Sequence, residues 1–167
     1  RVLFRSLARK PARLVLYDNS EIGLYELEQE LKSGNGTDTE IVVLLGSILN
    51  PGHLLNVIND FGVGTVYHAA AYKHVPLMEL NPDEAVTNNV KGTLNLVSTA
   101  EAFDVEQFIM ISTDKAVRPT NIMGATKRLA ELICQALAQE DGPTVFSMVR
   151  FGNVLGSSGS VIPRFRA

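Results

Sequence analysis

The amino-acid sequence predicts an α/β protein with a Rossmann-like, doubly wound parallel sheet. Short apolar runs rich in Val, Ile and Leu alternate with longer segments whose apolar residues recur at helical spacing. The short runs are continuously apolar, which is typical of parallel strands that helices cover on both faces. Their regular alternation with helices is typical of the doubly wound class.

The same pattern gives the expected order of elements. A helix from residue 51 begins with proline, which is well tolerated in a first helical turn. The Gly, Asn and Asp residues of segment 33–38 predict a turn or loop. Strands are expected at 13–17, 41–45, 65–68, 107–111 and 144–149. Helices are expected at 20–32, 51–61, 83–103 and 123–139.

A dinucleotide-binding fold normally opens with a strand and a glycine-rich turn that holds the pyrophosphate at a helix N-terminus. No such turn precedes the first expected strand, and residues 6–10 resemble the end of the helix that should follow it. We therefore expect a truncated fold, without its first strand, phosphate loop and C-terminal substrate part. Residues 1–6 are expected to be an assembly artefact, 7–149 the NAD(P)-binding domain, and 150–167 the start of the substrate-binding region.

Composition narrows the class of protein. The 167 residues, 46% hydrophobic and 20% charged, suffice for one core but not for two full domains. The net charge of −3 and the mixed signs leave no basic stripe for nucleic acid. No apolar run reaches the ~18 residues of a membrane span, so membrane attachment is expected only through segments absent here. Cys134 is expected to be a small buried hydrophobe, compatible with a cytoplasmic location, and no metal site is expected.

Asp18 directly follows the first expected strand. An acid at this point of a dinucleotide fold accepts hydrogen bonds from the adenosine ribose and repels a 2′-phosphate, so Asp18 favours NAD over NADP. The sequence Asp-Asn-Ser is equally suited to capping a helix, and both interpretations stay open. Ser47 and Ile48, after the next strand, would lie near the adenine, although a simple turn explains them on local sequence.

Ala69, Ala70 and Ala71 follow the third expected strand. Small side chains let a backbone approach a ligand closely. Lys73 and His74 continue this loop at the carboxyl edge of the sheet, where ligands bind in open α/β folds. Close packing of a helix on the sheet, with a solvated Lys–His pair, is the alternative.

Thr113, Asp114 and Lys115 follow the fourth expected strand. A carboxylate beside an amine supplies an acid and a base if their surroundings separate the two pKa values. A capping turn with a surface ion pair is the alternative. Met123 and Lys127 lie four residues apart on one helix face, from which Lys127 could reach a cofactor ribose. Their spacing alone favours a core methionine and a surface lysine.

Two further segments carry expectations. Gly92 lies within a long expected helix at a cost of ~1 kcal/mol relative to alanine, so close packing should compensate, and Asn89 could bridge neighbouring backbone groups. The Gly/Ser-rich segment 150–160 contains Asn153, Ser157 and Ser158. Its backbone N–H groups could cradle a nucleotide diphosphate, or it could be a flexible loop.

Three longer stretches carry a specific resemblance: HAAAYKHVP at 68–76, ISTDKAVRPTNIMGATKRLAE at 111–131, and RFGNVLGSSGSVIP at 150–163. Together and in this order they resemble the UDP-N-acetylglucosamine 4,6-dehydratases of bacterial capsule and O-antigen synthesis, which are extended short-chain dehydrogenase/reductases. The resemblance runs from about residue 6 to the end. It implies a UDP-sugar substrate, bound NAD (with NADP possible), and a homo-oligomeric parent at the cytoplasmic face of the inner membrane.

The resemblance also implies a reaction. A hydride leaves C4 of the sugar for NAD(P), water is lost across C5–C6, and the hydride returns to C6. By position, Thr113 would bind near O4, Asp114 would protonate the leaving C6 hydroxyl, and Lys115 would remove the C5 proton. Lys127 matches the superfamily's ribose-binding lysine. Met123 stands where the superfamily has tyrosine, a departure typical of the large membrane-associated branch.

The remaining implied contacts are with ligands. Asn153, Ser157 and Ser158 resemble contacts to the substrate diphosphate, and Lys73 and His74 are expected on the substrate side. Ser47 replaces an aspartate that the family usually carries near the adenine, which is expected to weaken cofactor binding.

Two other functions compete with a dehydratase. A nucleotide-sugar 4-epimerase usually keeps the tyrosine and lacks the Asp-Lys pair, so Asp114–Lys115 with Met123 argues against it. A non-catalytic NAD(P)-binding domain is disfavoured because Asp114, Lys115 and Lys127 are all present. The missing phosphate loop nevertheless predicts that this fragment is inactive by itself.

Overall fold

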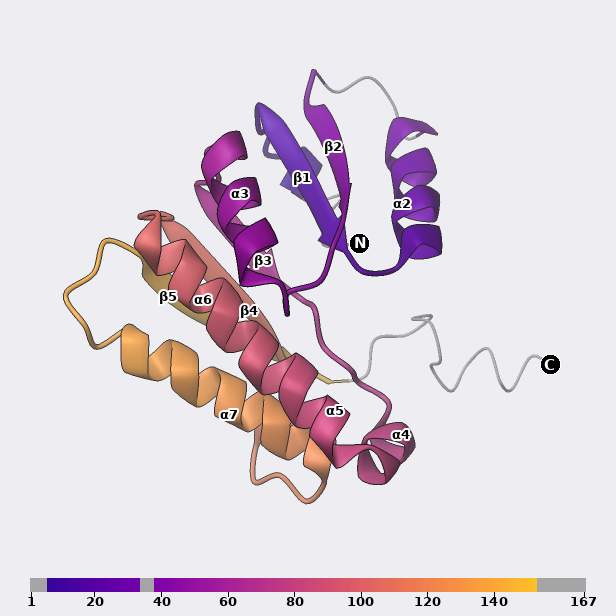
Figure 1. The fold of residues 1–167 in the computed structure, drawn as a ribbon, viewed down its shortest axis with the longest axis vertical. Helices are drawn as coiled ribbons and strands as arrows, with labels where there is room; N and C mark the ends of the chain where they lie inside the picture. Colours follow the sequence, from indigo (N-terminus) through magenta and orange to yellow (C-terminus); the bar gives the residue numbers. More distant parts are fainter. Residues whose placement is uncertain (1–5, 34–37, 153–167) are drawn as a thin grey trace.

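The computed structural model describes residues 6–33 and 38–152, which form an α/β fold with two parallel sheets (Figure 1). Strand β1 (Arg13–Asp18) pairs with β2 (Glu40–Leu45), with Leu16 opposite Val43. The second sheet has the order β3 (Thr65–His68), β4 (Gln107–Thr113), β5 (Val145–Phe151). All the pairings are parallel, and the predicted fold class is confirmed.

The strands form two sheets and not the single sheet that the sequence suggests, because β1 and β3 are not hydrogen-bonded to each other. In the doubly wound order 3-2-1-4-5-6, one strand lies between the second and the fourth. If β1 is the second strand of that order and β3 the fourth, then each observed pairing matches it. No strand among residues 6–33 and 38–152 occupies the place between β1 and β3.

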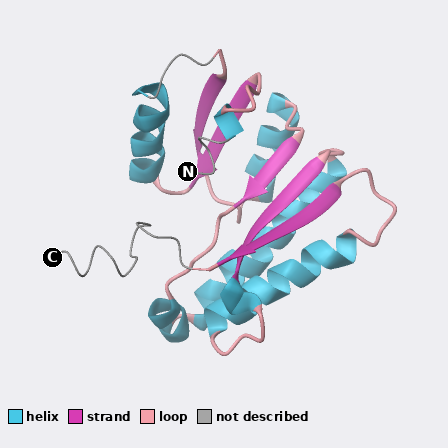
Figure 2. Ribbon diagram, turned by 180° about the vertical axis from the view of Figure 1, so that it is seen from behind, coloured by secondary structure: helices cyan, strands magenta, loops and turns pink. Residues whose placement is uncertain are grey.

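Four longer helices cover the sheets. Helices α2 (Glu21–Ser33) and α3 (Pro51–Phe61) flank the β1–β2 sheet. Helices α6 (Gly92–Ala102) and α7 (Ile122–Leu137) lie side by side on one face of the three-stranded sheet (Figure 2). The bounds of α3 and β3 agree with the sequence prediction, and the predicted ends of the others are within a few residues of those observed.

Local signals explain why α3 was predictable. The Asn50 side chain accepts a hydrogen bond from the His53 N–H at 3.1 Å, and Pro51 occupies the first turn. Gly62 ends the helix in the left-handed conformation, with φ 56°. Asn50 and Pro51 favour the start of the helix, and Gly62 favours its end, without help from the rest of the fold.

The long helix predicted at 83–103 is interrupted. It consists of α5 (Pro82–Val86), a π-helical turn (Thr87–Lys91) and α6. The wider turn buries both Asn88 and Asn89, and such π-bulges are frequent at functional sites. The short helix α4 (Val75–Leu80) was not predicted, because its six residues are too few to show a helical period.

The main core lies between β4 and helices α3, α6 and α7. Phe108 and Met110 of β4 are fully buried there, as is Cys134 of α7, whose Sγ lies 3.7 Å from the Met110 Sδ. The expectation that Cys134 is a buried hydrophobe is therefore confirmed. A second cluster joins α2 to β1 and β2 through Leu16, Leu24 and their neighbours.

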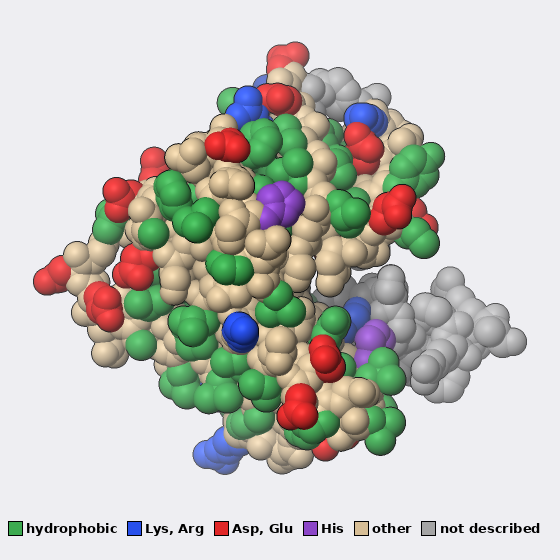
Figure 3. Space-filling model, in the orientation of Figure 1, with side chains coloured by type: hydrophobic (Ala, Val, Ile, Leu, Met, Phe, Trp, Pro, Cys, Tyr) green, Lys and Arg blue, Asp and Glu red, His purple; other side chains and the backbone are tan. Residues whose placement is uncertain are grey.

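The surface carries charges of both signs. On the face drawn in Figure 3, Lys and Arg side chains are scattered among acidic and apolar ones. Within residues 6–33 and 38–152, no helix has the length and apolar character needed to cross a membrane. The same residues contain no group of three or more His, Cys, Asp or Glu side chains that could hold a metal ion.

Gly92, the first residue of α6, packs closely against Ile48 of the main core. A Cβ at this position would lie 2.5 Å from the Cδ1 and 2.7 Å from the Cγ1 of Ile48, which is buried over the helix. The close packing that the sequence analysis expected is therefore present, and it explains a glycine in ordinary helical geometry.

We predict that Gly92→Ala lowers the free energy of unfolding by about 1 kcal/mol, because overpacking outweighs the gain in helix propensity. Urea denaturation measures the difference. Gly52→Ala is the matched control, since a Cβ there meets only the Asn50 side chain at 3.6 Å and should leave stability unchanged or raised. A stabilised Gly92→Ala protein would contradict the packing argument.

Candidate functional site

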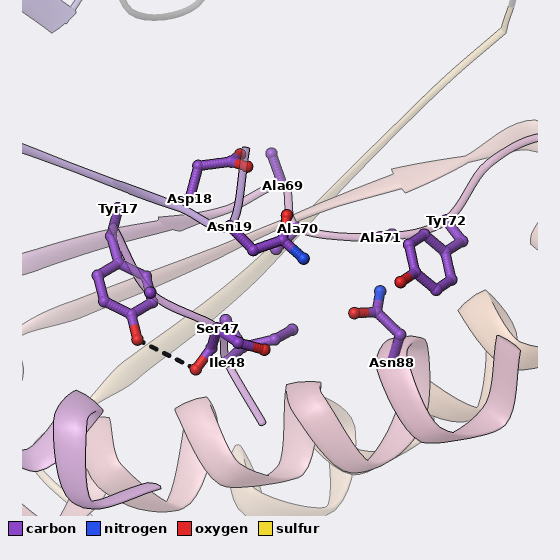
Figure 4. A pocket seen from close by; sticks show the side chains of 11 residues that line it. Tyr17, Asp18, Asn19, Ser47, Ile48, Ala69, Ala70, Ala71, Tyr72 and Asn88 are labelled. Carbon is purple, nitrogen blue, oxygen red and sulfur yellow. Dashed lines mark hydrogen bonds between the residues drawn. The ribbon is translucent and has the colours of Figure 1, made fainter. Parts of the chain in front are cut away.

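A pocket opens where the carboxyl ends of β1, β2 and β3 meet (Figure 4). Parallel strands deliver their C-terminal residues to one edge, and ligands of open α/β sheets bind there. The pocket gathers every residue predicted to contact the cofactor except Lys127. Its lining residues are Tyr17, Asp18, Asn19, Gly46, Ser47, Ile48, Ala69, Ala70, Ala71, Tyr72 and Asn88.

Small residues keep the pocket open. A Cβ at Gly46 would collide with the Tyr17 ring, whose hydroxyl donates to the Ser47 carbonyl oxygen at 3.0 Å. The edge of His53 packs against the same ring, with 5.3 Å between the ring centroids. Sequence reasoning missed Tyr17, because an aromatic residue inside an apolar strand looks like core.

Asp18 stands at the mouth of the pocket, exposed at the end of β1. Its Oδ1 accepts a hydrogen bond from the Ser20 N–H at 2.8 Å, and Ser20 Oγ in turn accepts from the Gly23 N–H at 3.1 Å. The capping interpretation of Asp-Asn-Ser is thus present in the structure. It is compatible with the ribose interpretation, because a carboxylate has two oxygens and several acceptor sites.

Asn89 clamps the loop that follows β3. Its Oδ1 accepts from the Tyr72 N–H at 2.8 Å, and its Nδ2 donates to the Tyr72 carbonyl at 3.0 Å. The same Nδ2 lies 3.0 Å from Thr126 Oγ1 on α7. The predicted bridging role of Asn89 is confirmed. The π-helical turn therefore fixes the pocket wall relative to the helix that carries Lys127.

The same loop places Lys73 and His74 at its exposed end, immediately before α4, with His74 as the N-cap residue. Asn153, Ser157 and Ser158 lie outside the described residues. Segment 1–5, most of the expected artefact, also lies outside them. Their predicted roles remain predictions.

The segment after β4 forms a tight polar turn. Thr113 caps a short 3-10 turn (Asp114–Ala116), and its hydroxyl donates to Asp114 Oδ1 at 2.9 Å. Lys115 Nζ lies 3.3 Å from the same oxygen. These hydrogen bonds, the Thr113 bond first and then that from Lys115, lower the pKa of Asp114. In this state the surroundings favour a carboxylate, so the acid role expected of Asp114 requires a change of environment.

Helix α7 packs against this turn. A Cβ at Gly124 would collide with the Lys115 carbonyl oxygen, so only glycine lets the helix approach the turn so closely. One turn on, Lys127 is buried, and its Nζ donates to the Ile111 carbonyl at 2.7 Å. The prediction of a surface lysine, which the spacing alone favoured, is therefore wrong. Desolvation lowers the pKa of Lys127 to about 8, partly offset by the charge of Glu131.

Met123 is part of an apolar cluster. It is buried with Met78 and Ala85, and Val75 and Ile122 pack against this cluster between α4, α5 and α7. A core methionine was the simpler interpretation of its spacing, and the structure agrees. Met123 has no proton to exchange, so its side chain could serve neither as an acid nor as a base.

His68 is a buried titratable group that the sequence analysis did not single out. Thr93 Oγ1 donates to the Asn89 carbonyl at 2.6 Å, which uses its only proton, so His68 Nε2, 2.7 Å away, must be the donor to Thr93. Nδ1 is then an acceptor, and it has no hydrogen-bond partner among the described residues. Desolvation, and then the charge of Lys127, lower the pKa of His68 to about 3.

Comparison with known proteins places the chain in a family. The model of the family described as "Polysaccharide biosynthesis protein" matches residues 1–167. The chain belongs to this family.

The curated relatives are longer proteins. The chain is 49% identical over 156 residues to the capsular polysaccharide biosynthesis protein CapD of Staphylococcus aureus, which covers 93% of the chain and 26% of CapD. It is 35% identical to an inverting UDP-N-acetylglucosamine 4,6-dehydratase of Campylobacter jejuni, over 94% of the chain and 46% of that enzyme. A UDP-glucose 4-epimerase of Rickettsia rickettsii is 49% identical, over 62% of the chain and 31% of its own length. The chain thus spans between about a quarter and a half of these relatives.

Solved structures support the fold. Pen from Bacillus thuringiensis superposes with a TM-score of 0.88 at 37% identity, covering 98% of this chain and 49% of Pen. The dTDP-glucose 4,6-dehydratase DesIV of Streptomyces venezuelae, solved with NAD, superposes with a TM-score of 0.78 at 19% identity, covering 98% of this chain and 55% of DesIV. The Rossmann-like short-chain dehydrogenase/reductase fold is therefore shown for this member of the family.

The buried His68 predicts a pH-dependent stability. Because its pKa is about 3 in the folded protein and ~6.5 in the unfolded chain, only the unfolded chain binds this proton between those values. Stability should then fall as pH falls from 6.5 toward 3, with a slope of about 1.4 kcal/mol per pH unit from this residue.

His68→Gln should remove that part of the slope, while His74→Gln, in the exposed loop, should keep it. Urea denaturation at several pH values between 4.5 and 7 measures both. Equal slopes in the wild-type and His68→Gln proteins would show that His68 is not held neutral.

Proposed function

We propose that this chain is the cofactor-binding and catalytic core of a nucleotide-sugar 4,6-dehydratase that acts on UDP-N-acetylglucosamine or a similar UDP-sugar for surface polysaccharide synthesis. The observation that carries the proposal is the Asp114–Lys115 pair. It stands at the carboxyl end of β4, on a turn that α7 supports beside the buried Lys127. An adjacent acid and base are what elimination of water requires.

The pocket at the strand ends is the proposed site for the adenosine part of a dinucleotide. Gly46 after β2 and Ala69, Ala70 and Ala71 after β3 let a ligand approach the backbone, and Asp18 at the end of β1 suits a ribose hydroxyl. NAD is the proposed cofactor, since the Asp18 carboxylate would repel the 2′-phosphate of NADP. When bound, the cofactor supplies a reversible hydride acceptor. Lys127 would hold the ribose next to the nicotinamide, and its charge would favour hydride transfer to the cofactor.

Asp114 and Lys115 can change roles together. As a carboxylate and an ammonium, they form an ion pair at 3.3 Å. In this state Asp114 has no proton to donate, and Lys115 cannot accept one. Transfer of one proton from Lys115 to Asp114 produces a neutral amine and a carboxylic acid without changing the number of bound protons. A covering substrate would favour this neutral pair, because desolvation disfavours charge. Lys115 then removes the C5 proton, and Asp114 protonates the departing C6 hydroxyl.

Thr113 is placed to assist at O4. Its hydroxyl is half-buried beside Asp114, and it can exchange a hydrogen bond with a substrate hydroxyl. This position matters because Met123 occupies the place of the superfamily's tyrosine and cannot accept a proton. We infer that the O4 proton leaves through Thr113 toward water, because the one proton that Asp114 takes up comes from Lys115.

The substrate side extends beyond the pocket. Lys73 and His74 in the loop before α4, and Asn153, Ser157 and Ser158 after β5, are the proposed contacts to the UDP-sugar. Residues 7–149 would then be the cofactor domain, and 150–167 the start of the substrate-binding part. Further segments of the kind that the longer relatives carry would be needed for turnover.

An epimerase is the second candidate, because the Rickettsia rickettsii relative named as a UDP-glucose 4-epimerase is as similar in sequence as CapD over the part it shares. The residues discriminate between the two. An epimerase needs no acid and base for loss of water, so the Asp114–Lys115 pair would have no task in it.

The decisive experiment uses a chimaera in which residues 7–167 replace the matching segment of the Campylobacter jejuni dehydratase. Incubated with NAD and UDP-N-acetylglucosamine, it should yield a product lighter by one water, seen by mass spectrometry. Conversion to UDP-N-acetylgalactosamine would establish the epimerase. A folded chimaera that binds NAD without turnover would leave only a cofactor-binding function.

Lys115→Ala in the active chimaera should abolish incorporation of solvent deuterium at C5, because no other amine in the described turn neighbours the acid. NMR of the product made in D2O measures the incorporation. Lys32→Ala, on the exposed face of α2, is the matched control and should incorporate deuterium normally. Continued incorporation in Lys115→Ala would remove Lys115 as the base.

A further inference from the structure

One buried carboxylate connects three elements at the edge of the site. Glu131 of α7 is fully buried. Its Oε1 accepts from Ser112 Oγ at 2.6 Å and from Arg150 Nε at 2.8 Å. Its Oε2 accepts from Arg150 Nη2 at 2.6 Å and from Arg128 Nη1 at 3.0 Å. Ser112 lies near the end of β4, and Arg150 near the end of β5.

The chemistry of these contacts requires a carboxylate. Four hydrogen bonds arrive at two oxygens, and a glutamine could accept on only one of them. The two bonds from Arg150 form a bidentate pair, which fixes direction as well as distance. The Arg150 hydrogen bond is the main reason that the pKa of Glu131 is lowered to about 2, so the residue is ionised throughout the neutral range.

Glu131 belongs to a stripe on α7 that follows β4. Gly124 abuts the Lys115 carbonyl, Lys127 donates to Ile111, Glu131 binds Ser112, and Cys134 contacts Met110. Within this stripe, Glu131 also binds a side chain of β5. It therefore holds the ends of β4 and β5 at a fixed separation from each other and from the helix.

The two strand ends meet at the catalytic pair. Ser112 is two residues before Asp114, and a Cβ at Gly152, two residues after Arg150, would lie 3.4 Å from Asp114 Oδ2. A shift of either strand end would move the carboxylate of Asp114 or close the space beside it.

We propose that Glu131 is a positioning residue, which, through Ser112 and Arg150, sets the place of the Asp114–Lys115 pair relative to the end of β5. The effect of Glu131 on the reaction rests on the proposed function. Its effect on the positions of the two strand ends does not. Arg150 accordingly directs two of its five N–H groups to Glu131.

The test compares the donors to Glu131. Ser112→Ala removes the bond to β4, and Arg150→Lys removes the bidentate bond to β5. Arg128→Ala is the matched control, because Arg128 joins Glu131 only within α7. Amide chemical shifts of Thr113, Asp114, Lys115 and Gly152 in the 167-residue chain should move in the first two variants and stay in the control. Equal shifts in the control, or none in Ser112→Ala and Arg150→Lys, would overturn the proposal.

Kinetics of the active chimaera test the catalytic part. Ser112→Ala should lower kcat about tenfold with little change in KM, since a small displacement of catalytic groups is costly for the transition state. Ser112→Thr keeps the hydroxyl and should restore most of kcat, which a general loss of stability would not explain. The double variant Glu131→Gln, Ser112→Ala should have the same kcat as Glu131→Gln alone, because Ser112 acts through Glu131. A further decrease of kcat in the double variant would contradict this.

The two proposals fail differently. If the unaltered chimaera forms no dehydrated product, then the proposed function fails while the chemical shifts still decide the structural claim. If the chimaera is active and Ser112→Ala has normal kcat, then Glu131 has no positioning role in the reaction.

Discussion

The contact of α7 with β4 is the constraint on which the site depends. Gly124, Lys127 and Glu131 lie along one face of α7. The helix can pack closely against β4 and the turn after it because Gly124, which meets the Lys115 carbonyl, has no side chain. Once the helix is seated, the hydrogen bonds of Lys127 and Glu131 to β4 follow from helical spacing, because positions three and four residues apart share a face.

This arrangement costs stability. Lys127 is buried as a cation, and His68 is buried as a neutral base with an unsatisfied Nδ1. Desolvation lowers the pKa of both side chains. An apolar residue of similar size at either position would therefore be expected to give a more stable fold. Glu131 differs, because its ion pairs more than offset its burial and lower its pKa. Strongly perturbed groups gathered at one strand edge are typical of functional sites.

The sequence predicted what local signals determine. The strand β3 was placed by its short apolar run, and the helix α3 by its helical pattern and the proline of its first turn, all of which act within a few residues. Asp18, Ser47 and the three alanines of the pocket could be singled out because parallel strands must end at a common edge. Asn89 and Gly92 were noted as anomalies in a helix, and tertiary contacts to Tyr72 and Ile48 explain them.

What the sequence could not show depends on partners far apart in the chain. Glu131 looked like an ordinary polar residue of an amphipathic helix, and its partners Ser112 and Arg150 each lie 19 residues away. The π-helical turn has no pattern of its own in a helical sequence. The separation of β1 from β3 follows from which strands are neighbours in the sheet, and strand order is set by the whole topology.

Met123 illustrates how packing and chemistry constrain each other. A tyrosine in the same place would bring a hydroxyl into an apolar cluster of Met78 and Ala85, where it would need a hydrogen-bond partner to offset desolvation. The flexible thioether instead fills the gap between α4, α5 and α7 without that requirement. Under the proposed function, a proton acceptor would then have to come from another element at the same sheet edge. The polar turn of Thr113, Asp114 and Lys115 packs against the same helix through Gly124, so exchangeable protons lie beside the helix although its Met123 has none.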